Sequence, residues 1–164
     1  MNAVDLLKYG HLTILQAVEK VPDSAWETPG VCGVWSVKEI LAHLTSFEQA
    51  LVEVLNALLE RQDDPPPLVS AMLADPQAFN DSQVAQRQSH TPAAVLAEYN
   101  AAQAQTLSLA AQIPAELFHQ NGALPWYGES YDLDDFLAYT YYGHKREHSA
   151  EINVFCDRLV REET

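Results

Sequence analysis

Residues 141–151 of the chain read Tyr-Tyr-Gly-His-Lys-Arg-Glu-His-Ser-Ala-Glu, with histidines at positions 144 and 148. On a helix, side chains four residues apart lie about 40° apart around the axis and roughly 6 Å apart along it. Both imidazoles can then reach one metal ion. Neutral imidazole is the commonest protein ligand for zinc and similar ions, so the spacing indicates a metal chelate.

The helix that carries this pair also has an apolar face, and both histidines lie within it. At about 100° per residue, the apolar side chains gather on one arc around His144. They are Leu133, Leu137, Tyr141, Ile152, Phe155 and Leu159. Burying two imidazoles without partners would cost several kcal/mol, which favours metal ligands over core polar residues, the alternative interpretation.

The rest of the chain predicts three further long helices. The first is expected over residues 2–20, the second from a cap at Ser36 to beyond Leu58, and the third over residues 91–112. The helix that carries His144 and His148 is expected to run from a cap at Asp132 to about Arg161. Residues 61–90 form a long crossover after the second helix, with a short helix near 69–73. Without a convincing alternating strand or repeat, the sequence predicts an all-α four-helix bundle, with residues 1–164 as one domain.

Two side chains near the start of the second helix have competing interpretations. Ser36 and Glu39 match a capping box, so Glu39 is expected to cap the helix rather than to bind metal. His43 lies at the edge of the buried face and can point inward. His11 lies on the apolar face of the first helix and is the main competitor for a metal position, although a hydrogen-bonded core histidine is the preferred interpretation.

Composition narrows the choice of partners. With 9 basic and 23 acidic residues, the formal charge of −14 would repel nucleic acid and anionic membranes. No run of 18 apolar residues and no signal-peptide pattern occur, so we expect a cytoplasmic protein. Cys32 and Cys156 are expected to be ordinary thiols.

Several stretches together resemble the DinB-like superfamily of bacterial metal-binding bundles. Residues 33–44 read Gly-Val-Trp-Ser-Val-Lys-Glu-Ile-Leu-Ala-His-Leu, Phe79-Asn80 precede the third long helix, and residues 143–148 read Gly-His-Lys-Arg-Glu-His. The turn at residues 125–127, Pro-Trp-Tyr, is similar to the branch that contains ClbS-type and DfsB-type proteins.

This resemblance implies a ligand set and an assembly. One histidine of the second helix and the pair on the last helix bind a divalent metal at one end of an up-up-down-down bundle, often in a homodimer. By motif match, these ligands are His43, His144 and His148. Zinc or nickel is the expected ion. Characterised relatives include thiol-dependent transferases and isomerases.

The leading functional hypothesis is a divalent-metal-dependent enzyme, either a hydrolase or a thiol-dependent transferase, that acts on a small electrophilic molecule. The alternative is a non-catalytic bundle that binds metal, a small molecule or a protein. Glu151, on the same stripe as the histidines, is the candidate catalytic carboxylate. It would act as a general base, or as an acceptor that orients His148; a solvated charge paired with Arg158 or a partner-chain residue is the third possibility. Glu147 lies nearer the edge of the stripe.

Overall fold

The structure is a computed structural model that describes residues 3–162. The expected helical position Asn2 lies outside the described residues. Within them the chain forms helices and loops, and extended pairing is limited to one isolated bridge between Cys32 and Trp35. The all-α class predicted from the sequence is confirmed. No helix in the described part of the chain is long and apolar enough to cross a membrane.

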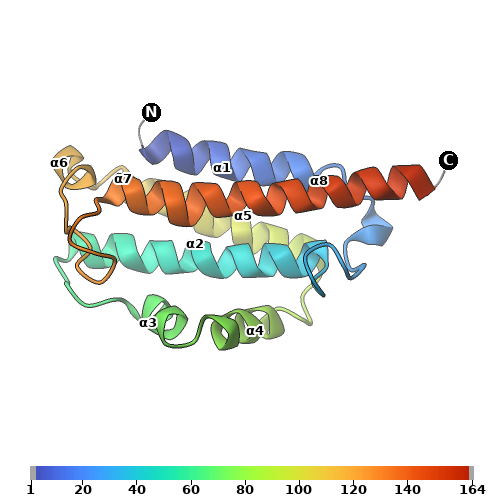
Figure 1. The fold of residues 1–164 in the computed structure, drawn as a ribbon, viewed down its shortest axis with the longest axis horizontal. Helices are drawn as coiled ribbons and strands as arrows, with labels where there is room; N and C mark the ends of the chain where they lie inside the picture. The colour runs from blue at the N-terminus through green and yellow to red at the C-terminus, as the bar shows by residue number, and fades with distance from the viewer. Residues whose placement is uncertain (1–2, 163–164) are drawn as a thin grey trace.

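Long helices run lengthwise and lie side by side (Figure 1). They are α1 (Ala3–Val18), α2 (Val37–Leu59), α5 (Pro92–Ala110) and α8 (His144–Glu162). The last is continuous with α7 (Leu133–Phe136) and with η2 (Leu137–Gly143), a segment of π-helix. Two short pieces, η1 (Asp23–Ala25) and α6 (Ala115–Phe118), lie in the connections between the long helices.

The direction of the helices differs from the expected up-up-down-down order. In Figure 1, α1 and α8 run one way while α2 and α5 run the other, so the order is up-down-down-up. The reason is the crossover, which returns the chain along the full length of α2 before α5 begins. Helices α2 and α5 are therefore parallel neighbours, and so are α1 and α8.

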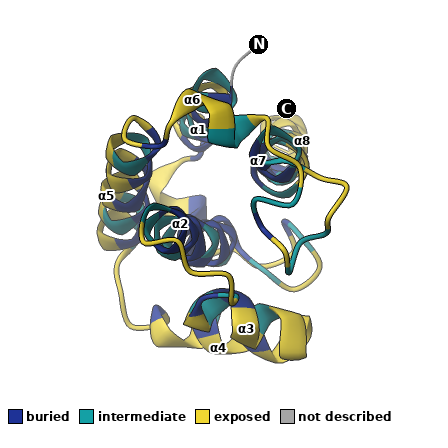
Figure 2. Cartoon of the chain, turned by 90° about the vertical axis from the view of Figure 1, so that its left-hand side faces the viewer, coloured by how far each residue is buried: buried dark blue, intermediate teal, exposed yellow. Residues whose placement is uncertain are grey.

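The long crossover is present, and it contains more helix than expected. Helix α3 (Pro67–Ala74) includes the short helix predicted near 69–73, whereas α4 (Pro76–Gln86) was not predicted. The signal for α4 was Asp75-Pro76: the Asp75 side chain accepts from the Ala78 amide, and Pro76 occupies the first turn. Both helices lie along the outer side of α2 (Figure 2).

Side chains specify where the two histidine-bearing helices begin. Ser36 caps α2, and its backbone amide donates to the Glu39 carboxylate in a capping box. Asp132 caps α7 in the same way, with Asp135 as the reciprocal acceptor. Both predicted caps are confirmed.

The interior consists of two apolar clusters with a polar layer between them. In this layer Lys145 of α8 is paired with Glu48 of α2 at 2.5 Å, and their side chains are 2% and 0% exposed. Lys145 also donates to Gln103 of α5 at 2.9 Å. The α1 backbone passes close by at Gly10, where a Cβ atom would lie 3.1 Å from the Lys145 side chain.

The aromatic turn at residues 124–128 closes one end of the molecule. Leu124 is buried, and the rings of Trp126 and Tyr127 pack on Phe136 with centroids 5.5 and 4.8 Å away. As expected from the sequence, this turn covers the core.

Candidate metal centre

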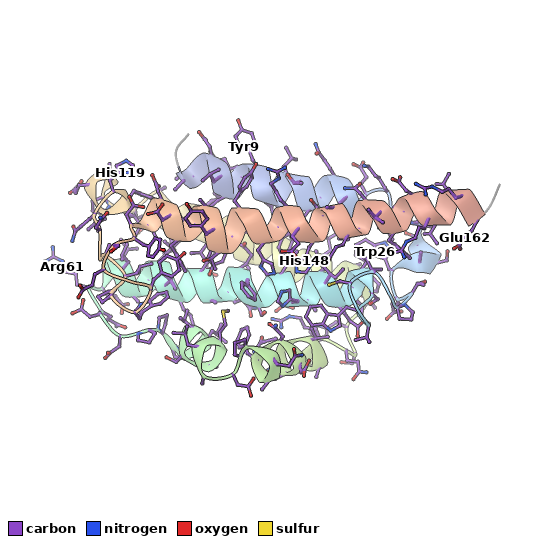
Figure 3. All side chains as sticks on the ribbon, viewed as in Figure 1. Tyr9, Trp26, Arg61, His119, His148 and Glu162 are labelled. Atoms are coloured by element: carbon purple, nitrogen blue, oxygen red, sulfur yellow. The ribbon has the colours of Figure 1, made fainter. Side chains whose placement is uncertain are left out.

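Three imidazoles from two helices converge on one point. The Nε2 atom of His144 lies 2.9 Å from Nε2 of His43 and 2.9 Å from Nε2 of His148. His43 lies in the second turn of α2, and the other two occupy the start of α8. Figure 3 places His148 between these helices. The expected convergence is therefore present, while the metal role of the three residues stays a prediction.

Aromatic side chains surround this histidine cluster, defined as His43, His144 and His148. The Phe47 ring lies 4.8 Å from the His43 ring and 4.5 Å from the His144 ring. The Trp35 ring lies 4.9 Å from His43 on another side. These contacts exclude water from part of the cluster, which strengthens any electrostatic interaction within it.

Burial keeps His43 and His144 neutral. Desolvation, followed by the charge of His148, lowers the pKa of His43 to about 3. Desolvation and the neighbouring charges of His148, His43 and Lys145 also lower the pKa of His144 to about 3. Neutral imidazoles have the free lone pair that metal binding requires. The cluster presents three imidazole nitrogens to one point, so its chemistry fits a zinc-type divalent ion with three protein ligands.

Glu151 contacts the far edge of His148. Its Oε2 atom lies 2.8 Å from His148 Nδ1, across the ring from the Nε2 atom that faces the cluster. This is the geometry of an acceptor that orients a ligand histidine and sets its tautomer. Glu147 is exposed, in keeping with its expected place nearer the edge of the stripe.

Cys32 also lies beside Glu151, and sequence reasoning missed this placement. Potential ligand atoms of Cys32, His148 and Glu151 lie within 4.8 Å of one another. Desolvation, a hydrogen bond to Glu151 and the charges of Glu151 and Glu147 raise the pKa of Cys32 to about 11, so the thiol is protonated at neutral pH. No local pattern could have revealed this contact, because Cys32 is in a loop more than 100 positions before its neighbours.

Two other candidates have different partners. Glu39 is in the capping box of α2, as expected. His11 stacks on Tyr99 with ring centroids 4.8 Å apart. Desolvation and then the charge of Lys145 lower its pKa to about 4, although a hydrogen bond to Asn100 opposes this shift. His11 is half-buried against Tyr99, and it does not belong to the cluster.

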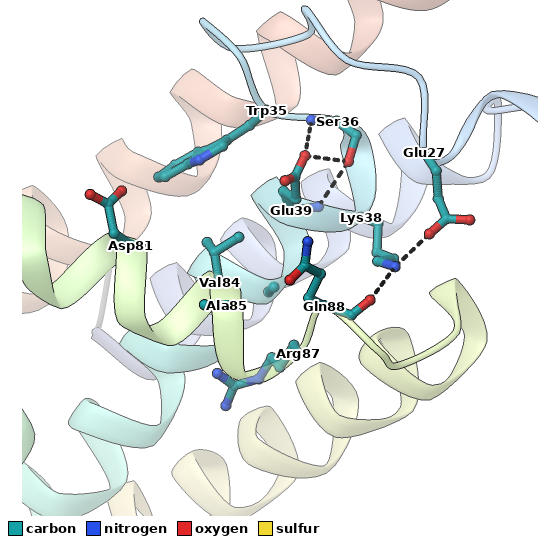
Figure 4. A pocket seen from close by; sticks show the side chains of 11 residues that line it. Glu27, Trp35, Ser36, Lys38, Glu39, Asp81, Val84, Ala85, Arg87 and Gln88 are labelled. Carbon is teal, nitrogen blue, oxygen red and sulfur yellow. Dashed lines mark hydrogen bonds and ion pairs between the residues drawn. The ribbon is translucent and has the colours of Figure 1, made fainter.

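A pocket of about 360 Å³ opens beside the cluster, between the start of α2, helix α4 and the preceding loop (Figure 4). Trp35 lines this pocket and also contacts His43. On another wall, the buried Lys38 ammonium is paired with Glu27 at 2.5 Å and donates to the Gln88 carbonyl at 3.0 Å. Trp35 thus links the pocket to the histidine cluster.

A solved structure shows the same fold. The chain is similar to the crystal structure of an uncharacterised protein from Escherichia coli UTI89, with a TM-score of 0.77 and 9% sequence identity. The similarity covers 95% of this chain and 91% of that chain. Among curated proteins, none matches the sequence.

A family model gives the most direct relationship. Residues 10–127 match the mycothiol maleylpyruvate isomerase N-terminal domain. The match includes His43 and ends before α8, which contributes His144 and His148. That family is part of the DinB-like superfamily, whose domains bind metal, and the all-α fold agrees with it. The chain therefore belongs to the mycothiol maleylpyruvate isomerase N-terminal domain family of DinB-like proteins.

Proposed function

We propose that this protein is a divalent-metal-dependent enzyme, either a hydrolase or a thiol-dependent transferase, that acts on a small electrophilic molecule. The observation that carries the proposal is the convergence of three imidazoles in a DinB-like protein, with Nε2 of His144 2.9 Å from Nε2 of both His43 and His148. A three-histidine set leaves coordination positions open, unlike the four-ligand set of a structural zinc site.

His43, His144 and His148 would hold the ion, with zinc or nickel the best fit to imidazole ligands. The ion would supply a Lewis acid that activates a nucleophile or polarises the electrophile. Glu151 holds His148 by its Nδ1 edge and keeps Nε2 available as a ligand atom. Phe47 and Trp35 limit the access of water to the cluster.

The proposed substrate is a small molecule rather than nucleic acid or a membrane surface. A formal charge of −14 supports this choice because it disfavours polyanionic partners. The pocket beside Trp35, with a volume of about 360 Å³, has the size of a small-ligand site.

We also propose that the protein is a homodimer. Large apolar side chains are exposed on the outer helices, among them Tyr9 and Leu12 of α1 and Val154 of α8. Exposed apolar groups of this kind are candidates for burial between subunits. Sedimentation equilibrium should give twice the chain mass; a monomer at micromolar concentration would contradict the proposal.

The central test is metal content combined with turnover. Protein purified without chelator should contain about one divalent ion per chain by elemental analysis, and His144→Ala should contain none while staying helical by circular dichroism. The matched control is His119→Ala, because His119 is 73% exposed and pairs only with Asp134 among the interactions of the described chain.

Activity separates the enzyme from a metal-binding module. The wild type should turn over activated esters or epoxides, with or without a low-molecular-weight thiol, and lose this activity on chelation. Metal that is bound without any metal-dependent rate would support the non-catalytic alternative. Equal metal content in His144→Ala and wild type would refute the ligand assignment.

A further inference from the structure

One ring nitrogen of the histidine cluster has no partner. His43 is only 3% exposed, and its Nδ1 atom is buried without a hydrogen bond within residues 3–162. A buried polar atom left unpaired destabilises a folded protein, so such an atom requires an explanation. His148, by contrast, has Glu151 at the equivalent nitrogen.

Asn80 of α4 has the complementary unpaired atom. Its Oδ1 is also buried and without a hydrogen bond in the described part of the chain. The neighbouring residue anchors α4 beside His43: Phe79 is 4% exposed, and its ring lies 6.3 Å from that of Phe47, which in turn lies 4.8 Å from His43. The Asn80 side chain also interacts with the His43 imidazole.

We propose that Asn80 is a positioning residue whose Oδ1 accepts a hydrogen bond from His43 Nδ1–H. This bond satisfies both unpaired atoms and selects the tautomer in which His43 Nε2 carries a free lone pair. Asn80 of α4 and Glu151 of α8 then have equivalent roles. Asn80 accepts a hydrogen bond from Nδ1–H of His43, and Glu151 accepts one from Nδ1–H of His148. The importance of this bond for metal binding rests on the proposed function.

The opposite orientation of the Asn80 amide makes a contrary prediction. If the amide nitrogen faced His43, Nδ1 would have to accept and the ring proton would move to Nε2. That tautomer cannot offer Nε2 to a metal ion. The protonation site of His43 in the metal-free protein therefore discriminates between the two orientations.

The first measurement is nitrogen-15 NMR of the histidine rings in the metal-free protein, with His43 assigned from the signals lost in His43→Gln. Wild type should be protonated at Nδ1 of His43, and Asn80→Ala should shift the ring toward a mixture of tautomers. Asn80→Asp should restore the wild-type tautomer, because a carboxylate also accepts from Nδ1–H. Protonation at Nε2 in the wild type, or an unchanged tautomer in Asn80→Ala, would overturn the proposal.

The second measurement is Zn²⁺ affinity by chelator competition. Asn80→Ala should bind Zn²⁺ about 10–100-fold more weakly, as is usual when the support of a ligand histidine is removed. Asn80→Asp should bind at least as tightly as wild type. Gln77→Ala is the matched control, because Gln77 is exposed on the same helix and donates to Asp81. Affinity equal to wild type in Asn80→Ala would refute the positioning role.

The two measurements separate the failure of this inference from that of the proposed function. If wild type binds no Zn²⁺, the proposed function fails, and the His43 tautomer still decides whether the Asn80 bond exists. If wild type binds Zn²⁺ and the tautomer is insensitive to Asn80, only the inference fails.

Discussion

The hydrogen bond between His148 Nδ1 and Glu151 Oε2, 2.8 Å long, distinguishes two possible roles for Glu151 at the proposed metal site. A general base must reach a proton on the reacting side of the cluster. Glu151 instead contacts the ring edge that faces away from the other two histidines. The geometry favours a role for Glu151 in orienting His148 over a role in proton transfer.

Glu151→Gln should therefore retain the metal, because an amide oxygen still accepts from Nδ1–H, whereas Glu151→Ala should weaken binding about 10–100-fold. Chelator competition measures both, with the exposed Glu147→Gln as control. A loss of turnover of at least about tenfold in Glu151→Gln, with full metal content, would instead identify a general base.

Three histidines with lowered pKa values should make the metal-free protein sensitive to acid. His11 has a pKa of about 4, and His43 and His144 have values of about 3, all below the unfolded value of 6.5. Below pH 6.5 the unfolded chain takes up protons that the folded chain excludes. The contribution of these neutral histidines to the free energy of unfolding is therefore complete above pH 6.5. It decreases as the pH falls toward 4, by at most about 1.4 kcal/mol per pH unit for each histidine.

Urea unfolding of the metal-free protein at pH 7.5, 6.0 and 5.0 measures this dependence. The midpoint should fall with pH, and His11→Asn should show a shallower fall than wild type. A midpoint that is constant or rises between pH 7.5 and 5.0 would contradict the neutral state of these rings.

At the scale of elements, the continuous helix formed by α7, η2 and α8 contains a π-helical segment that sequence periodicity did not reveal. Residues 137–143 form a π-helix immediately before His144. Leu133, Leu137 and Tyr141 are nevertheless buried as predicted, because a spacing of four residues is close to one turn of either helix type. The helix begins at the predicted cap, and its internal geometry changes where the histidine cluster starts.

The caps of the two histidine-bearing helices should each contribute measurable stability. Ser36→Ala and Asp132→Ala should each lower the free energy of unfolding by about 0.5–2 kcal/mol, since each removes an acceptor for a first-turn amide. Urea denaturation monitored by circular dichroism measures the effect. Asp64→Ala, in an exposed loop, is the control, and midpoints of both cap variants equal to wild type would refute the capping roles.

At the scale of the whole molecule, the Lys145–Glu48 pair joins α8 to α2 inside the polar layer. Lys145 also contacts Gln103, and its ammonium lies 5.7 Å from the centre of the Tyr99 ring on α5. Desolvation and the charge of Glu48 raise the pKa of Tyr99 well above its usual value. One cation thus contacts side chains of two helices at the boundary between the apolar clusters.

Lys145→Met should destabilise the protein by about 3–5 kcal/mol, because Glu48 would be left buried without a counter-charge. Adding Glu48→Leu should recover much of the loss, since an apolar pair avoids the desolvation cost. Urea denaturation of the single and double variants measures this. Lys20→Met is the exposed control, and a single variant as stable as wild type would refute the argument.

Sequence alone determined the features that depend on local spacing. It predicted the all-α class, the caps at Ser36 and Asp132, the long crossover and the stripe that carries His144 and His148. These follow from periodicity and capping chemistry, which act over a few residues. Local spacing placed His43 only at the edge of its face, and the motif resemblance associated it with the other two histidines.

Tertiary structure decided which distant side chains meet. Packing of the helices brings His43 to the α8 pair, places Cys32 beside Glu151 and buries Lys145 against Glu48. The direction of the helices likewise depended on the path of the crossover along α2. Such contacts join residues that are far apart in the chain, and their geometry arises from the packing of whole helix faces, which no local pattern encodes.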